Sequence, residues 1–157
     1  MKRRSFLIGL PLAGLVAAGV FYFGRAGAEP KPPINDLRTP GLAIDGYDPV
    51  AYFLDARPVK GNDSFSLRWR GSEWRFANDE HRRLFEADPS RYAPAYGGYC
   101  AYGAAQGYRV KIEPEAWSIR QGRLYLNYDL AVRDQWLEDP DGYIARADRN
   151  YPELTGG

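Results

Sequence analysis

The chain is poor in the side chains that bind metals and cross-link domains. Its 157 residues include one cysteine, one histidine and one methionine. A single cysteine excludes an intramolecular disulfide, so packing must stabilise the fold. A four-ligand structural zinc site of cysteine and histidine cannot be assembled from two such side chains. The chain also lacks a Gly-x-Ser-x-Gly elbow and a phosphate-binding glycine loop, so the common hydrolase and nucleotide-binding signatures are absent.

Blocks of like charge are absent as well. The chain has 21 basic and 20 acidic side chains, and four of the basic ones lie in residues 1–28, which have no acidic residue. Residues 29–157 therefore carry a formal charge of −3. This balance does not favour a nucleic-acid partner.

Residues 1–28 have the three parts of an export signal: a basic start, an apolar run over residues 8–23 and Ala26-Gly27-Ala28 at the end. The segment Arg3-Arg4-Ser5-Phe6-Leu7 resembles a twin-arginine signal. Without cleavage after Ala28, residues 6–24 are long enough to anchor the chain in a membrane. Both outcomes predict a periplasmic domain that meets the membrane only through this segment.

The remainder predicts an α+β fold with a small antiparallel sheet of hairpins and short flanking helices. We expect a Pro-rich linker at 29–41, one domain at 42–152 and a C-terminal tail at 153–157. Alternating apolar residues predict hairpins around Gly71 and Gly122 and a strand at 108–112. No internal repeat is evident.

The most informative segment is residues 92–103, which hold four tyrosines, three glycines and Cys100. This composition predicts a shaped loop. One interpretation is a binding pocket lined by the loop, and the other is that the rings fill the core with their hydroxyls bonded to backbone carbonyls. The candidate ligand-binding residues are Tyr96, Gly97, Gly98, Tyr99 and Tyr102.

Cys100 is the first candidate metal ligand, with His81 and Asp48 as partners. A thiolate is a soft ligand, so copper(I) is the favoured metal. In the alternative interpretation Cys100 is a buried structural residue, Asp48 caps a helix that starts after Pro49, and His81 is a solvated helix residue. A thiol-dependent enzyme would need His81 as a base, and its arginine neighbours oppose the imidazolium.

Several segments resemble the YHS-domain family in its longer, exported form, in order and spacing. They are residues 46–53 (GYDPVAYF), 74–77 (WRFA), 85–92 (FEADPSRY), 94–102 (PAYGGYCAY) and 124–128 (LYLNY), together with Trp117 and Ala147-Asp148. Small YHS domains accompany copper-transporting ATPases and multicomponent oxygenases and are taken as metal-binding, often through cysteine pairs. This chain departs from that pattern with one cysteine, so a cysteine-rich site does not carry over.

The sequence therefore predicts an exported, non-enzymatic YHS-like binding domain of the bacterial envelope that binds a metal ion, with copper favoured, or another small ligand. The loop at 96–102 is the expected site. The alternative is a protein-interaction or scaffold module that docks an envelope partner and whose Cys100 is structural. A thiol-dependent enzyme is the third hypothesis.

Overall fold

The computed structural model describes residues 34–155, with the side chains of residues 153–155 excepted. The predicted export signal and the first residues of the predicted linker lie outside this range. Among the described residues, no helix has both the length and the apolar character needed to cross a membrane.

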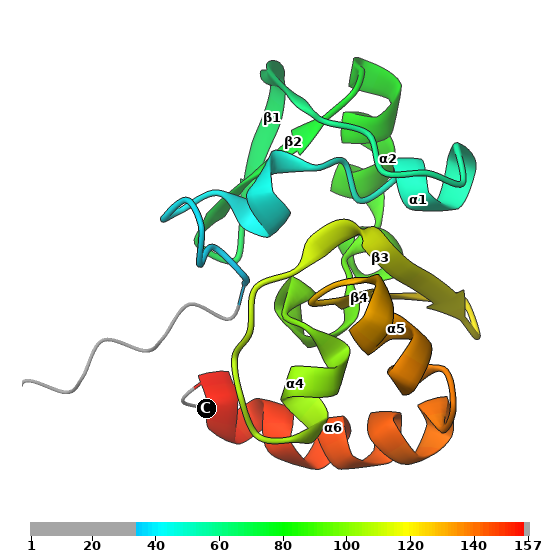
Figure 1. Cartoon of the computed structure of the whole chain (residues 1–157). Coiled ribbons are helices and arrows are strands. Elements are labelled where there is room, and N and C mark those ends of the chain that lie inside the picture. Colours follow the sequence, from blue (N-terminus) through cyan, green and yellow to red (C-terminus); the bar gives the residue numbers. More distant parts are fainter. Residues whose placement is uncertain (1–33, 156–157) are drawn as a thin grey trace, which may run out of the picture.

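The α+β class is confirmed, with two separate antiparallel hairpins set among short helices (Figure 1). The strands are β1 (Asn62–Trp69), β2 (Ser72–Phe76), β3 (Glu113–Arg120) and β4 (Arg123–Asn127). The α-helices are α1 (Ala51–Leu54), α2 (Asp79–Ala87), α3 (Pro89–Tyr92), α4 (Ala101–Ala105), α5 (Leu130–Trp136) and α6 (Pro140–Thr155). Two short 3-10 helices, η1 (Ala43–Gly46) and η2 (Ala95–Gly98), precede α1 and α4.

Both hairpins close through two-residue turns. Arg70 and Gly71 join β1 to β2 with φ of 48° and 81°, and Gln121 and Gly122 join β3 to β4 with φ of 51° and 74°. Positive φ at both turn residues matches the right-handed twist of the flanking strands. Each predicted hairpin is therefore confirmed at its predicted turn.

The two hairpins belong to two units with the same order of elements. The first unit runs η1, α1, β1, β2, α2 and the second runs η2, α4, β3, β4, α5. The residue that follows the tyrosine after each 3-10 helix donates its backbone N–H to a valine carbonyl, Asp48 to Val59 at 2.9 Å and Cys100 to Val110 at 3.0 Å. The expectation of no internal repeat is therefore wrong at the level of structure.

The repeat is hard to see in the sequence because few equivalent positions hold the same residue. Identical pairs occur at the 3-10 helices: Ala43 and Ala95, Gly46 and Gly98, and Tyr47 and Tyr99. Core positions differ in size and shape, since the place of Trp74 is taken by Tyr125 and that of Phe85 by Trp136. Packing tolerates such exchanges when the total volume is kept.

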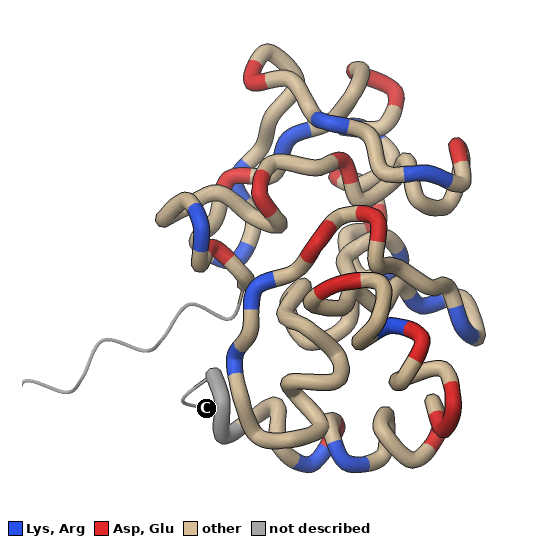
Figure 2. The backbone as a smooth tube through the Cα atoms, viewed as in Figure 1, with Lys and Arg blue, Asp and Glu red and all other residues tan. Residues whose placement is uncertain are grey.

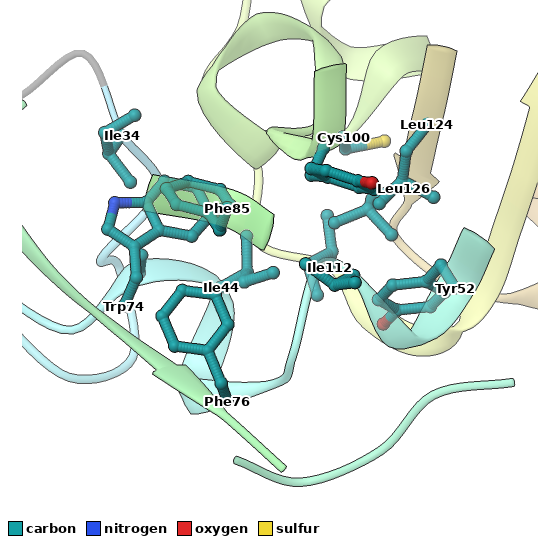
Figure 3. Packing of buried hydrophobic residues seen from close by; sticks show 13 residues of the cluster. Ile34, Ile44, Tyr52, Trp74, Phe76, Phe85, Cys100, Ile112, Leu124 and Leu126 are labelled. Atoms are coloured by element: carbon teal, nitrogen blue, oxygen red, sulfur yellow. The ribbon is translucent and has the colours of Figure 1, made fainter. Parts of the chain in front are cut away.

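Strand β4 separates two hydrophobic clusters. Leu124 and Leu126 face the larger cluster, beside Cys100 (Figure 3). Tyr125 faces the smaller cluster, where its ring lies 5.1 Å from that of Trp136. Both faces of this strand are therefore buried. Alanines on α4 and Ala147 on α6 line the second cluster and let these helices approach closely.

Three predicted boundaries differ from the structure. Ile34 and Asn35 are buried, and Asn35 donates its backbone N–H to the Gly97 carbonyl at 2.8 Å, so the domain begins earlier than residue 42. Helix α6 continues to Thr155, past the predicted start of the tail at 153. Residues 108–112 form no strand, and β3 instead includes Pro114 at a register shift, where a missing N–H is tolerated.

Candidate functional site

The segment at 92–103 folds into the end of α3, the 3-10 helix η2 and the short helix α4. Tyr92, Tyr96 and Tyr99 are buried, whereas Tyr102 is half-buried. The Tyr96 hydroxyl donates to Asp148 Oδ1 at 3.0 Å, and the Tyr99 hydroxyl donates to the Ile34 carbonyl at 3.1 Å. Three of the four rings therefore fill the core.

Gly98, a candidate ligand-binding residue, is required by packing. Its φ is +84°, and a Cβ added there would lie well inside van der Waals contact with Ile44 Cγ2, a fully buried atom of the core. Its carbonyl accepts from the Asn35 side chain at 2.9 Å. Gly97, by contrast, borders a surface cavity described below.

Cys100 is buried among leucines and backbone groups. Its Sγ accepts the Gly103 N–H at 3.3 Å and lies 3.6 Å from Asn127 Oδ1, to which it donates. Burial raises the pKa of the Cys100 thiol, although the backbone N–H groups of Gly103, Tyr128 and Tyr102 act in the opposite direction. The sulfur therefore has the surroundings of a structural thiol rather than a reactive one.

We expect Cys100 to resist alkylation in the folded chain. At about pH 8, iodoacetamide should react on the order of 100-fold more slowly with the native protein than with the protein unfolded in guanidinium, because the native thiol is protonated and inaccessible. Mass spectrometry of quenched samples measures both rates. Equal rates in the two states would contradict the structural role.

Asp48 and His81 form a buried pair, with Nδ1 2.6 Å from Asp48 Oδ2. Asp48 is fully buried, and its Oδ1 accepts the N–H groups of Val50 at 2.8 Å and Ala51 at 3.3 Å. Its Oδ2 also accepts the Ala77 N–H at 2.8 Å. Asp48 accepts the two N–H groups at the start of α1, as a cap would, although the helix proper begins at Ala51 with Val50 as its N-cap residue. The solvated position expected for His81 is wrong, because its ring turns inward to this carboxylate.

Cys100 occupies in the second unit the position that Asp48 occupies in the first. Asp48 receives the N–H groups of the residues two and three places after it and of Ala77, the first residue after β2. Cys100 Sγ accepts the N–H of Gly103, three places after it, and donates to Oδ1 of Asn127, the last residue of β4. The N–H of Tyr102, two places after Cys100, donates to the same Asn127 oxygen at 3.1 Å. Each side chain ties a short helix to the end of its hairpin.

The predicted metal ligands are therefore engaged in two separate sets of interactions. Within residues 34–155, no group of three or more histidine, cysteine, aspartate or glutamate side chains has an arrangement that could hold a metal ion. Cys100, His81 and Asp48 do not make up a ligand set in this part of the chain.

An open cavity of about 260 Å³ lies beside residues 93–97. It is bordered by the β1–β2 turn, the start of β4 and the C-terminal part of α6, so segments far apart in the sequence meet there. The residues that carry polar or aromatic groups into its lining are Trp69, Arg70, Ser90, Tyr96, Arg123, Asp148 and Tyr151.

The cavity has two basic side chains and aromatic walls. The guanidinium of Arg70 lies over the Trp69 ring at 4.7 Å. The rings of Tyr96 and Tyr151 meet edge to face at 5.6 Å. Burial raises the pKa of Tyr151 to about 12, so its hydroxyl is protonated at neutral pH. Of the candidates named from the sequence, Tyr96 and Gly97 line this cavity.

Sequence inspection missed the other lining residues. Arg70 and Arg123 stand beside turn glycines, where a charged residue is ordinary, and Tyr151 lies on the last helix. Only their shared position around one cavity distinguishes them.

Comparisons of the chain with protein-family models, curated proteins and solved structures found no match. The resemblance to the YHS-domain family therefore stays a prediction that rests on the motifs. What the domain does must be inferred from its own geometry.

Proposed function

We propose that the chain is an exported, YHS-like, non-enzymatic binding domain of the bacterial envelope, and that its site is the cavity beside residues 93–97. The observation that carries the proposal is the meeting of two guanidinium groups and three aromatic rings around one open cavity. Ligand sites combine such apolar walls with a few convergent polar groups.

We do not propose that Cys100, His81 and Asp48 bind copper(I). The Cys100 thiol is buried and hydrogen-bonded, and its pKa is raised by burial. The carboxylate of Asp48 already accepts four hydrogen bonds, including the one from His81. Metal binding at either residue would require these bonds to break.

A thiol-dependent enzyme has a related difficulty, because the thiol is not bonded to a base. The Cys100 thiol donates to Asn127 and His81 is bonded to Asp48, so the two side chains do not form the thiol–base hydrogen bond that the mechanism needs. The scaffold alternative shares the structural role of Cys100 with our proposal. The cavity favours a small ligand, because its volume of about 260 Å³ is slightly below that of sites for drug-sized molecules.

Blocking the cavity should abolish ligand-induced stabilisation. Ser90 is exposed and lines the cavity, so Ser90→Tyr should fill the cavity without disturbing the core. In a screen of small aromatic compounds, a ligand at about ten times its Kd should raise the Tm of the wild-type chain by about 4 °C. The same ligand should leave the Tm of Ser90→Tyr unchanged.

Ser64→Tyr is the matched control, because Ser64 is an exposed residue of β1 that does not line the cavity. This variant should respond to ligand as the wild type does. Stabilisation by copper(I) that persists in Ser90→Tyr and disappears in Cys100→Ser would place the site at the thiol and contradict the proposal.

A further inference from the structure

We infer that the cavity beside residues 93–97 takes a small planar organic anion, of the class of aromatic carboxylates. This inference rests on the proposed function and adds the chemistry of the ligand. It follows from the charge of the lining, the position of the aromatic rings and the size of the cavity.

The charge of the lining comes from Arg70 and Arg123. Among the described residues, neither guanidinium takes part in an ion pair, whereas six other arginines pair with carboxylates. Arg70 stacks on Trp69 at 4.7 Å and Arg123 on Tyr125 at 5.7 Å. Stacking on a ring restricts a guanidinium while leaving its N–H edge available for a carboxylate.

Among the described residues of the lining, the only acidic one is Asp148, and one of its oxygens already accepts the Tyr96 hydroxyl. The two arginines and one aspartate of this described lining give a formal charge of +1. A cleft with an excess of one sign attracts the opposite charge from solution. A carboxylate is matched to the fork of N–H donors that a guanidinium presents.

A second hollow on the domain shows why charge alone does not identify a site. It is lined by Arg38, Asp45 and Glu113, among others. There Arg38 is 2.8 Å from Glu113 and 3.4 Å from Asp45, so its charge is already balanced by protein carboxylates. In the part of the backbone that Figure 2 colours, basic and acidic residues are interspersed without a block of one sign.

Aromatic rings make the cavity suited to a flat ligand. Trp69, Tyr96 and Tyr151 all line it, and the rings of the two tyrosines meet edge to face. A ligand ring can pack against such faces and edges, which adds to the contribution of area burial. The volume of about 260 Å³ suits one substituted ring, so benzoate is the appropriate probe.

Benzoate titrated into the full chain, followed by the indole N–H signals in nitrogen-labelled protein, tests the inference. We expect saturable binding that shifts the Trp69 signal. Benzamide, which has the ring without the charge, should bind at least about tenfold more weakly, as should inorganic phosphate, which has the charge without the ring. Arg70→Gln and Arg123→Gln should each weaken benzoate binding about fivefold to tenfold.

Arg57→Gln is the matched control, because Arg57 is exposed and does not line the cavity. It should bind benzoate as the wild type does, and all three variants should unfold at the same denaturant concentration. Benzamide or phosphate binding as tightly as benzoate, or unchanged binding in both cavity variants, would overturn the inference and leave the proposed function standing. If no anionic, neutral or cationic aromatic compound shifts the Trp69 signal, both fail.

Discussion

Replacing Asp48 by alanine is expected to lower the free energy of unfolding by about 3–5 kcal/mol, because several buried donors lose the one acceptor that they share. The carboxylate is fully buried and accepts four hydrogen bonds, from Val50, Ala51, Ala77 and His81. Alanine leaves all four donors without an acceptor in the interior. Urea unfolding followed by tryptophan fluorescence measures the change.

Asp55→Ala is the control, because Asp55 is exposed at the end of α1. It should change the free energy of unfolding by less than about 0.5 kcal/mol. Asp48→Asn should fall between the two variants, since the amide keeps one oxygen as an acceptor but loses the charge. A loss for Asp48→Ala as small as that for Asp55→Ala would contradict the role of the buried pair.

Replacing Gly98 by alanine is expected to lower the free energy of unfolding by about 3–5 kcal/mol, the sum of backbone strain and overpacking. Its φ of +84° is strained for an L-residue, and the new Cβ would overlap the fully buried side chain of Ile44. Pro94 lies next nearest, with Cγ at 3.1 Å from the position of the added atom. The change is measured in the same urea unfolding experiment.

Gly122→Ala separates the two contributions. Gly122 has a φ of +74°, but an added Cβ would meet nothing within 4 Å. This variant should cost only the backbone strain, about 1–2 kcal/mol. Equal losses at Gly98 and Gly122 would show that Gly98 is not selected by its contact with Ile44, which would reopen its role as a ligand-binding residue.

Local chemistry was sufficient to predict the elements of the fold. A turn glycine between alternating apolar residues located each hairpin, and Asp48 before Pro49 located the start of α1 to within two residues. The strand predicted at 108–112 is absent. Val110 and Ile112 alternate with polar residues as in a strand, but the fold holds them in an irregular segment. The Val110 carbonyl there accepts from Cys100.

The features that the sequence did not predict depend on hydrogen bonds between residues that are far apart in the sequence. His81 is 33 residues from Asp48, and its helix alone gives no sign that the ring turns inward to a carboxylate. Tyr96 bonds to Asp148, 52 residues away, which turns a candidate ligand-binding ring into one wall of a cavity. These partners are set by how the two units and α6 pack together.

The repeat explains why a lone cysteine stands in the most informative segment. Position 48 and position 100 are equivalent, and each side chain accepts a backbone N–H from its own helix and is bonded to the end of its own hairpin. The carboxylate of Asp48 is also bonded to His81, whereas the thiol of Cys100 is bonded to Asn127. The structural role of Cys100 is therefore enough to explain a cysteine at this position.

We propose that ligands bind in the cavity beside residues 93–97 and not at Cys100. The indole N–H signals in an NMR spectrum of the nitrogen-labelled full chain test this proposal. Trp69 lines the cavity, whereas Trp117 and Trp136 do not. With increasing aromatic ligand, we predict a saturable shift of the Trp69 indole N–H and of the Gly97 amide, with the Trp117 and Trp136 signals unmoved. Shifts centred on the amides of Cys100 and Gly103, with Trp69 unchanged, would contradict the account.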